Sequence, residues 1–282
     1  IVAAGKTLSI TNTAGAILNW QSFSIGANEV TRFIQPNAAS SVLNRVVGPD
    51  PSTLLGQLAS NGRVFLINPA GILVGAGARI DTAGFIASTL NISNSDFLAG
   101  RLNFSGSSGA GVVNQGQIVT PTGGSVYLIA GQVGNEGLIH TPGGETLLAA
   151  GYSVRLIDSG TPGLSVEVTG GGQATNLGTL TAEAGRVGIA GALVRQAGAI
   201  SASSLIREGG RVFLKASQRA EVDNGSIDVG SASSTGGRIE ITGDAVALTG
   251  SSALNASGAT GGGQILVGGG FQGKDASVAN AT

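Results

Sequence analysis

Residue types that could do chemistry are sparse in this sequence, and the acids are the first to test. The densest acidic group is Glu221, Asp223 and Asp228, and Glu221 and Asp223 would share one face of a strand. Clustered carboxylates can act as acid and base on a polysaccharide. The calcium-binding Gly-Gly-x-Gly-x-Asp repeat is absent, because the glycines of residues 269–275 miss its spacing. We therefore interpret the three acids as part of a solvated edge.

Metal, cofactor and nucleophile chemistry find no support either. His140 is the only histidine and cysteine is absent, so no His/Cys metal site can be spaced along the chain. The glycine pairs of the sequence precede β-forming segments rather than helices, which excludes a nucleotide-binding fingerprint. With 15 basic and 16 acidic residues the net charge is −1, and nothing favours nucleic acid as a partner. We predict no enzyme, no metal and no cofactor.

A repeated glycine-pair motif followed by a β-forming segment is the main signal. One copy is Gly123-Gly124-Ser-Val-Tyr-Leu-Ile-Ala, and another is Gly236-Gly237-Arg-Ile-Glu-Ile-Thr-Gly. Further copies begin at Gly143, Ala184, Gly209 and Gly262, with an earlier one at Asn61. A second column pairs a polar turn residue with glycine and begins at Asn114, Asn135, Asn176, Gln196 and Asn224. Each repeat therefore holds at least two short strands, each opened by a turn.

Alternation within the motif predicts which side faces the core. From Gly123 onward, the second and fourth residues after the glycine pair are aliphatic except at Thr146, and the sixth is always alanine or glycine. The first and third residues are mixed, which is typical of a solvent-facing side. A unit this short cannot bury its own apolar face, whereas stacked copies can. The sequence therefore predicts an all-β solenoid, a parallel β-helix, right-handed by the general crossover rule.

The repeats also predict how the chain is organised. We expect one β-helical domain over residues 1–282. Solenoid ends expose ladder edges that need covering, so residues 1–60 would form an N-terminal cap and the first coils. Residues 61–282 would form the repeated coils. Two stretches break the pattern and are expected to leave the coil, the second as a hairpin: residues 92–113 and 157–175.

Three local features give further expectations. The apolar spacing of residues 49–58 permits one short helical turn. Phe65 and Phe85 lie one 20-residue step apart, and we expect them to pack under a loop or an external hairpin; the alternative is an outer stack that binds a sugar ring or a partner strand. The sequence opens at Ile1 without a signal peptide and stops without a visible cap, so we expect a fragment of a longer chain.

Several segments between Leu18 and Asp96 resemble a known family. They are Asn19-Trp-Gln-Ser-Phe-Ser-Ile-Gly26, Ser41-Val-Leu-Asn-Arg-Val46, Gly62-Arg-Val-Phe-Leu-Ile-Asn-Pro-Ala-Gly-Ile72 and Ala87-Ser-Thr-Leu-Asn-Ile-Ser-Asn94. These segments are similar to the secretion domains of filamentous haemagglutinin-like and high-molecular-weight adhesins, which are exported by two-partner secretion. The looser repeats from 112 to 270 extend the resemblance over nearly the whole chain.

The resemblance implies a fold, a partner and a location. The fold is a right-handed β-helix with extra-helical strands, at the amino-terminal end of a large adhesin of a Gram-negative bacterium. The chain would cross the periplasm unfolded and be recognised by the periplasmic domains of an outer-membrane β-barrel transporter. It would then fold at the cell surface or outside the cell and nucleate folding of the rest. The full-length adhesin would contact host-cell surface glycans or proteins.

The family's signature turn has a counterpart in this sequence. Its Asn-Pro-Asn-Gly element appears as Asn68-Pro69-Ala70-Gly71, with alanine at the third position. A second element, Asn-Pro-Asn-Leu, has a looser counterpart in Gln35-Pro36-Asn37-Ala38. The repeat register places Asn68 at an inward position, where a buried asparagine must bond the backbone of its turn. Pro69 would preset φ and Gly71 would permit a tight corner. A turn-forming role and a direct transporter contact both stay open.

Two alternative functions are kept beside the secretion domain. A β-helix can carry polysaccharide-cleaving or polysaccharide-binding activity, so a carbohydrate-active protein is the main alternative. This segment could instead bind host glycans itself, although its sequence shows no concave aromatic platform for a sugar.

Overall fold

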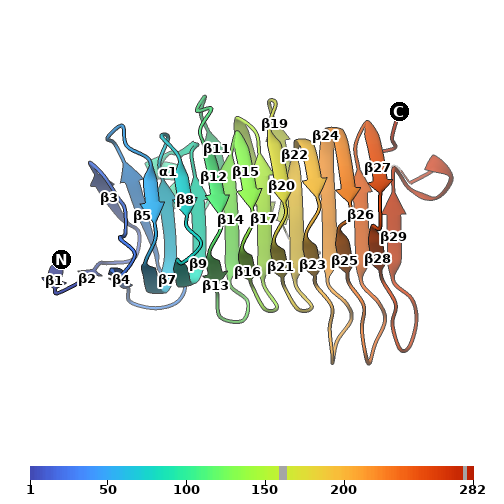
Figure 1. Cartoon of the computed structure of the whole chain (residues 1–282), viewed down its shortest axis with the longest axis horizontal. Coiled ribbons are helices and arrows are strands. Elements are labelled where there is room, and N and C mark those ends of the chain that lie inside the picture. Colours follow the sequence, from blue (N-terminus) through green and yellow to red (C-terminus); the bar gives the residue numbers. More distant parts are fainter. Residues whose placement is uncertain (159–163, 276–277) are drawn as a thin grey trace.

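Parallel strand ladders, wound into a helix, make up most of the chain. The computed structural model describes residues 1–158, 164–275 and 278–282, and within them 25 strands belong to one sheet. The coils stack along one axis, with the N-terminus at one end and the C-terminus at the other (Figure 1). The architecture is a right-handed parallel β-helix. The prediction of an all-β solenoid is confirmed.

The coils build three ladders, which we call A, B and C in chain order; the first and last coils contribute strands to A and B alone within the described residues. Ladder A contains β2 (Thr7–Thr11), β4 (Val30–Ile34), the first parts of β7 (Gln57–Ile67) and β9 (Arg79–Ser88), β13 (Gln117–Val119), β16 (Leu138–His140), β21 (Thr179–Thr181), β23 (Ala199–Ser201), β25 (Ser226–Asp228) and β28 (Ala253–Asn255). Every pairing between neighbouring coils in ladder A is parallel, as stacked repeats require.

Ladders B and C follow the same rule. Ladder B contains β3 (Ala16–Trp20), β5 (Ser41–Val46), the second parts of β7 and β9, β14 (Ser125–Ala130), β17 (Glu145–Ala150), the first parts of β22 (Arg186–Gln196) and β24 (Arg211–Asp223), β26 (Arg238–Thr242) and β29 (Gln264–Val267). Ladder C contains β6 (Ser52–Leu54), β8 (Ile72–Val74), β12 (Gly111–Asn114), β15 (Gln132–Asn135), β20 (Gln173–Asn176), the second parts of β22 and β24, and β27 (Ala245–Thr249).

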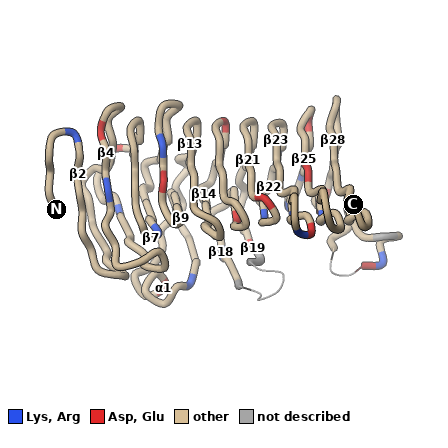
Figure 2. Tube along the Cα trace, turned by 90° about the horizontal axis from the view of Figure 1, so that it is seen from below, with Lys and Arg blue, Asp and Glu red and all other residues tan. Residues whose placement is uncertain are grey.

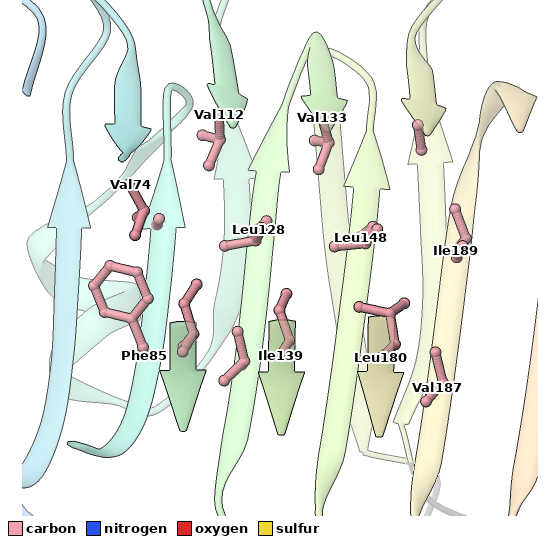
Figure 3. Packing of buried hydrophobic residues seen from close by; sticks show 14 of the residues in the cluster. Val74, Phe85, Val112, Leu128, Val133, Ile139, Leu148, Leu180, Val187 and Ile189 are labelled. Carbon is pink, nitrogen blue, oxygen red and sulfur yellow. The ribbon is translucent and has the colours of Figure 1, made fainter. Parts of the chain in front are cut away.

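Aliphatic side chains from all three ladders fill the interior. Figure 3 shows Leu128 of β14, Leu148 of β17 and Ile189 of β22 following one another along the axis, and all three are fully buried. These are positions that the alternation of the motif assigned to the core. Burial of one such side chain contributes about 1.5–3 kcal/mol. An apolar residue occupies the same position in the coils above and below. The inward column therefore supplies the main apolar stabilisation.

A row of buried amides lies inside the corner that follows ladder C. Asn114 donates to Asn135 Oδ1 (2.7 Å), Asn135 to Asn176 Oδ1 (2.8 Å), and Asn176 to Gln196 Oε1 (2.8 Å). All four side chains are fully buried. Each amide also makes a hydrogen bond with the backbone of its own turn or of a neighbouring coil. The row therefore gives hydrogen-bond partners to polar groups that the closed corner shields from water. Asn224, from the same column of the sequence, instead takes a left-handed conformation (φ 54°) and lies outside.

At the N-terminal end, one strand covers the edge of a ladder, and another strand stands where a helical turn was expected within residues 49–58. β1 (Val2–Ala4) runs antiparallel to β2 and covers the free edge of ladder A. Residues 52–54 form strand β6, not a helical turn. Ser52 and Leu54 point inward and are fully buried, and parallel pairing with β8 overrides the local apolar spacing. The prediction of a helical turn within residues 49–58 was therefore wrong.

Two excursions from the coil meet on the outer face of ladder B. The first contains β10 (Asn91–Ile92), α1 (Asn94–Leu98) and β11 (Leu102–Ser105); the second is the hairpin of β18 (Ser153–Asp158) and β19 (Leu164–Thr169). β11 pairs with β18, so the two excursions form one antiparallel sheet. Both excursions were predicted, although the first ends earlier, at β12, and the second begins earlier, at Ser153. Their pairing was not predicted. Residues 159–163 of the second excursion lie outside the described residues.

Charge is sparse over the whole helix. Figure 2 shows long uncharged stretches of the trace, interrupted by short charged bands. Helix is also scarce, and none of the helices in the described parts of the chain has the length and apolar character of a membrane span.

Candidate functional site

The signature turn lies at the corner between β7 and β8. Asn68 is fully buried and Pro69 is exposed. The Asn68 side chain accepts a hydrogen bond from the backbone N–H of Ala70 (2.9 Å), and its carbonyl accepts from Gly71 N–H (3.1 Å). Gly71 has φ +119°, a conformation that favours glycine. The turn is therefore built from its own residues.

Asn68 also ties its corner to the preceding coil. Its amide nitrogen donates to the carbonyl of Asp50 (3.0 Å) and to the hydroxyl of Ser52 (2.9 Å). On the outer side, Ser108 of the first excursion donates to the carbonyl of Pro69 (2.6 Å). The Asn68 side chain thus makes its hydrogen bonds within the folded corner. The parts of the turn that face outward are Pro69 and Ala70.

The second motif lies at a different corner, between β4 and β5. Gln35 is buried and donates through Nε2 to Ser60 Oγ (3.1 Å) and to the carbonyl of Arg63 (3.0 Å). Asn37 forms a local turn in which its Oδ1 accepts from the backbone N–H of Ser40 (3.0 Å). Arg63 opens the ladder B part of β7, whereas Asn68 follows its end. The two motifs are therefore separated by about 16 Å of strand and do not form one site.

The acidic group does not form a catalytic pair. Glu221 and Asp223 are on the ladder C part of β24, on its outer face. Asp228 belongs to ladder A. Asp223 pairs with Arg195 (2.7 Å), and this hydrogen bond holds the pKa of its carboxyl below the ordinary value. Glu221 pairs with Arg219 (3.4 Å). The acids are thus partners of exterior ion pairs and hydrogen bonds, and the described residues contain no cluster of His, Cys, Asp and Glu that could hold a metal.

Phe65 and Phe85 face opposite sides of the sheet. Phe85 is fully buried inside the helix, while Phe65 lies outside under α1, edge-on to Phe97 with ring centroids 5.1 Å apart. The expectation of packing under an excursion is confirmed for Phe65 and wrong for Phe85. A bulge between Ser60 and Arg63 shifts the register, so that Phe65 pairs with Ile86. A one-residue slip moves a side chain to the other face.

Sequence reasoning missed a polar network on the outer face of ladder B. Tyr127 donates to Glu145 Oε2 (2.9 Å), and Arg186 donates to Glu145 Oε1 (3.2 Å). Burial raises the pKa of the Tyr127 phenol, and the charge of Glu145 adds to this effect, so the phenol stays protonated. The network lines a groove of about 740 Å³ that also contains Arg207 and Arg211. The signal was present in the first and third positions of the glycine-pair motif, which were interpreted only as solvent-facing.

Comparison with known proteins identifies the family. The family model "TPS secretion domain" matches residues 1–258. This chain belongs to the TPS secretion domain family. The crystal structure of the HMW1 secretion domain from Haemophilus influenzae is similar to it with a TM-score of 0.93 and 36% identity, over 99% of this chain and 77% of that one. The filamentous hemagglutinin secretion domain superposes with a TM-score of 0.45 at 16% identity, over 95% of this chain and 96% of that one.

Curated relatives match this TPS secretion domain over only part of their length. The heme/hemopexin-binding protein of Haemophilus influenzae strain Rd is 33% identical over 151 residues, which are 48% of this chain and 16% of that protein. A second heme/hemopexin-binding protein from Haemophilus influenzae is 40% identical over 77 residues, which are 27% of this chain and 8% of that protein. The chain thus spans well under half the length of the curated relatives it matches.

Membership of the family confirms the resemblance seen in the sequence. TPS secretion domains belong to exported haemagglutinin- and adhesin-like proteins and engage an outer-membrane transporter. The chain is therefore secreted through the outer membrane to the cell surface or the extracellular space. Within this TPS secretion domain, the Asn68 turn and the outer groove of ladder B are the two candidate sites.

Proposed function

We propose that this TPS secretion domain is the amino-terminal part of a large adhesin and that a cognate outer-membrane transporter reads the Asn68–Gly71 segment while the chain is unfolded. The burial of Asn68 carries the proposal. In the folded coil its side chain is inaccessible and bonds Asp50, Ser52 and Ala70. A transporter that recognises this side chain can therefore do so only before the corner closes.

Folding outside the cell would then make export directional. Closing the corner withdraws Asn68 from the transporter and adds one more rung to each ladder. Each completed coil buries aliphatic side chains that a return through the pore would have to expose again, at about 1.5–3 kcal/mol for each side chain. The same stacking would let the first coils act as a template for those that follow. Contacts with host-cell glycans or proteins are proposed for the full-length adhesin.

Binding to the periplasmic domains of the transporter tests this proposal. The wild-type chain and Asn68→Ala would be compared both in urea, at a concentration the transporter domains withstand, and after refolding. We expect the unfolded wild-type chain to bind, the unfolded Asn68→Ala chain to bind at least about tenfold more weakly, and neither folded chain to bind. Export of the same variants from cells that contain the transporter would be measured in parallel.

Control variants separate recognition from folding. Ser108→Ala removes the outer hydrogen bond to Pro69 without touching the four-residue segment, so unfolded-state binding should not change. The proposal is overturned if the folded wild-type chain binds as tightly as the unfolded chain. It is equally overturned if deletion of residues 68–71 leaves both binding and export unchanged.

A further inference from the structure

A row of arginines crosses the outer face of ladder B. Arg186, Arg211 and Arg238 occupy consecutive rungs in register, each at the start of its strand. Neighbouring rungs are about 4.8 Å apart. Like charges directly opposite each other on adjacent strands are destabilising. A row of this kind therefore needs compensation from acids or from an anionic ligand.

Acids pair with the two ends of the row, and another acid, Glu208, lines the groove near its centre. Arg186 bonds Glu145 (3.2 Å), and Arg238 bonds Glu240 (2.8 Å). Arg211 lies between them, is exposed, and has no ion pair with any acid in the described ranges 1–158, 164–275 and 278–282. Glu208 makes no ion pair with Arg211 among the described residues, so the central guanidinium has no direct anionic partner.

A loop brings a further arginine to the groove beside Arg186 and Arg211. Arg207 lies between β23 and β24 and lines the groove together with Arg186 and Arg211. The loop is held in place because the Arg207 N–H donates to Ser204 Oγ (2.9 Å) and its carbonyl accepts from Ser231 Oγ (2.6 Å). The charge at this position is therefore presented by an ordered backbone.

An aromatic side chain lies beside the arginine row. A Cβ atom on Gly188 would overlap the ring of Phe213, so that ring occupies the space directly above the glycine. Phe213 is half-buried and follows Arg211 by two residues on the same strand, which places both on the outer face. The structure therefore places one partly exposed aromatic side chain beside Arg211, packed at its base against the outer hydrophobic cluster.

We propose that this face binds an acidic polysaccharide. A carboxylate or sulfate group would bond Arg211 between the two flanking arginines, and the C–H face of a sugar ring would stack on Phe213. Charge-assisted hydrogen bonds to guanidinium fit either anion, and one sugar ring spans about one coil of the helix. The net charge of −1 gives no long-range attraction to any polyanion, so binding would rest on the local contacts of Arg211 and Phe213 with one acidic sugar rather than on the charge density of a polyphosphate. The site is independent of export, since it exists only in the folded coil.

Calorimetric titration of the folded 282-residue chain tests this assignment. The probes are a heparin tetrasaccharide, a hyaluronan hexasaccharide, inorganic sulfate and a DNA duplex; the two oligosaccharides distinguish sulfate from carboxylate recognition. We expect at least one oligosaccharide to bind, Arg211→Gln to weaken it at least about tenfold, and Phe213→Leu to weaken it about fivefold. Arg155→Gln, on the exposed hairpin, is the matched control and should leave affinity unchanged.

Several outcomes would overturn the assignment. Absence of oligosaccharide binding would do so, as would binding that Arg211→Gln leaves unchanged while the variant keeps the wild-type unfolding midpoint. Equal affinity for inorganic sulfate, with no effect of Phe213→Leu, would reduce the row to a simple anion site. DNA binding as tight as oligosaccharide binding would show general polyanion attraction instead.

Discussion

Asn68 occupies an inward position that the other glycine-pair motifs fill with alanine or glycine. Its amide makes hydrogen bonds within its own turn and to the preceding coil, so a single side chain both shapes a corner and joins two coils. An unpartnered amide in this place would cost about 1–3 kcal/mol. The buried amides from Asn114 to Gln196 follow the same rule at another corner. Polar groups in this core therefore specify corners, whereas aliphatic groups supply most of the stability.

Replacing Asn68 tests this role separately from secretion. Asn68→Leu should lower the free energy of unfolding by about 2 kcal/mol or more, because the Asp50 carbonyl and the Ala70 N–H lose their partner. Urea unfolding followed by circular dichroism measures this change. Ala70→Asn restores the family's third residue at a half-buried position and should stay within about 0.5 kcal/mol of wild type. Equal losses for both variants would contradict a specific role for Asn68.

At the scale of elements, the two excursions cover apolar groups on the outer face of ladder B. Phe97 of α1 packs on Phe65, and β11 joins β18 across sequence-distant coils. α1 is short and is held at both ends: Ser93 caps its N-terminus, and Asp96 pairs with Arg101 just beyond its C-terminus (2.7 Å). The covering layer thus depends on a few side-chain contacts, in contrast to the continuous ladders beneath it.

The pH dependence of this layer follows from Asp96. Hydrogen bonds from Arg101 and Ser93 hold the pKa of its carboxyl below the ordinary value. A depressed pKa in the folded state contributes stability above the unfolded-state value of about 4, and this contribution is lost as pH falls through the folded-state pKa. Asp96→Asn should therefore lower the thermal midpoint at pH 7, with the difference from wild type closing as the pH falls through the depressed pKa of Asp96.

A second substitution checks the cause. Arg101→Gln should lower the midpoint at pH 7 in the same direction, and should leave a smaller pH dependence than wild type, because the pKa of Asp96 then returns toward its ordinary value. A difference between wild type and Asp96→Asn that persists unchanged at low pH would contradict the assignment.

At the scale of the whole molecule, burial declines toward the C-terminal end. Leu214, on a rung with neighbours on both sides, is fully buried, whereas Ile265, at an inward position of the last rung of ladder B, is 42% exposed. β29 pairs with β26 and has no further rung of ladder B in the described residues. The end coil therefore has one neighbour where central coils have two, as expected of a solenoid whose stability is a sum over adjacent repeats.

Matched truncations in the two coils test this gradient. Leu214→Ala should cost about 2–5 kcal/mol in the free energy of unfolding, because it leaves a cavity between two rungs. Ile265→Ala should cost less than about 1.5 kcal/mol, because its side chain is already half in solvent. Urea unfolding of both variants measures the difference, and equal costs would contradict a graded solenoid.

The sequence by itself determined the inward column, the parallel β-helix and the two excursions, since a period-two pattern repeated in register is visible without any contact between distant residues. Only the tertiary structure decided how those parts meet. The bulge in β7 placed Phe65 outside and Phe85 inside, because one inserted residue reverses every side chain that follows. The pairing of β11 with β18, the arginine row beside Phe213 and the bond from Asn68 to Asp50 all join separate coils. Such contacts depend on which rungs become neighbours, and that is set by the winding of the whole chain.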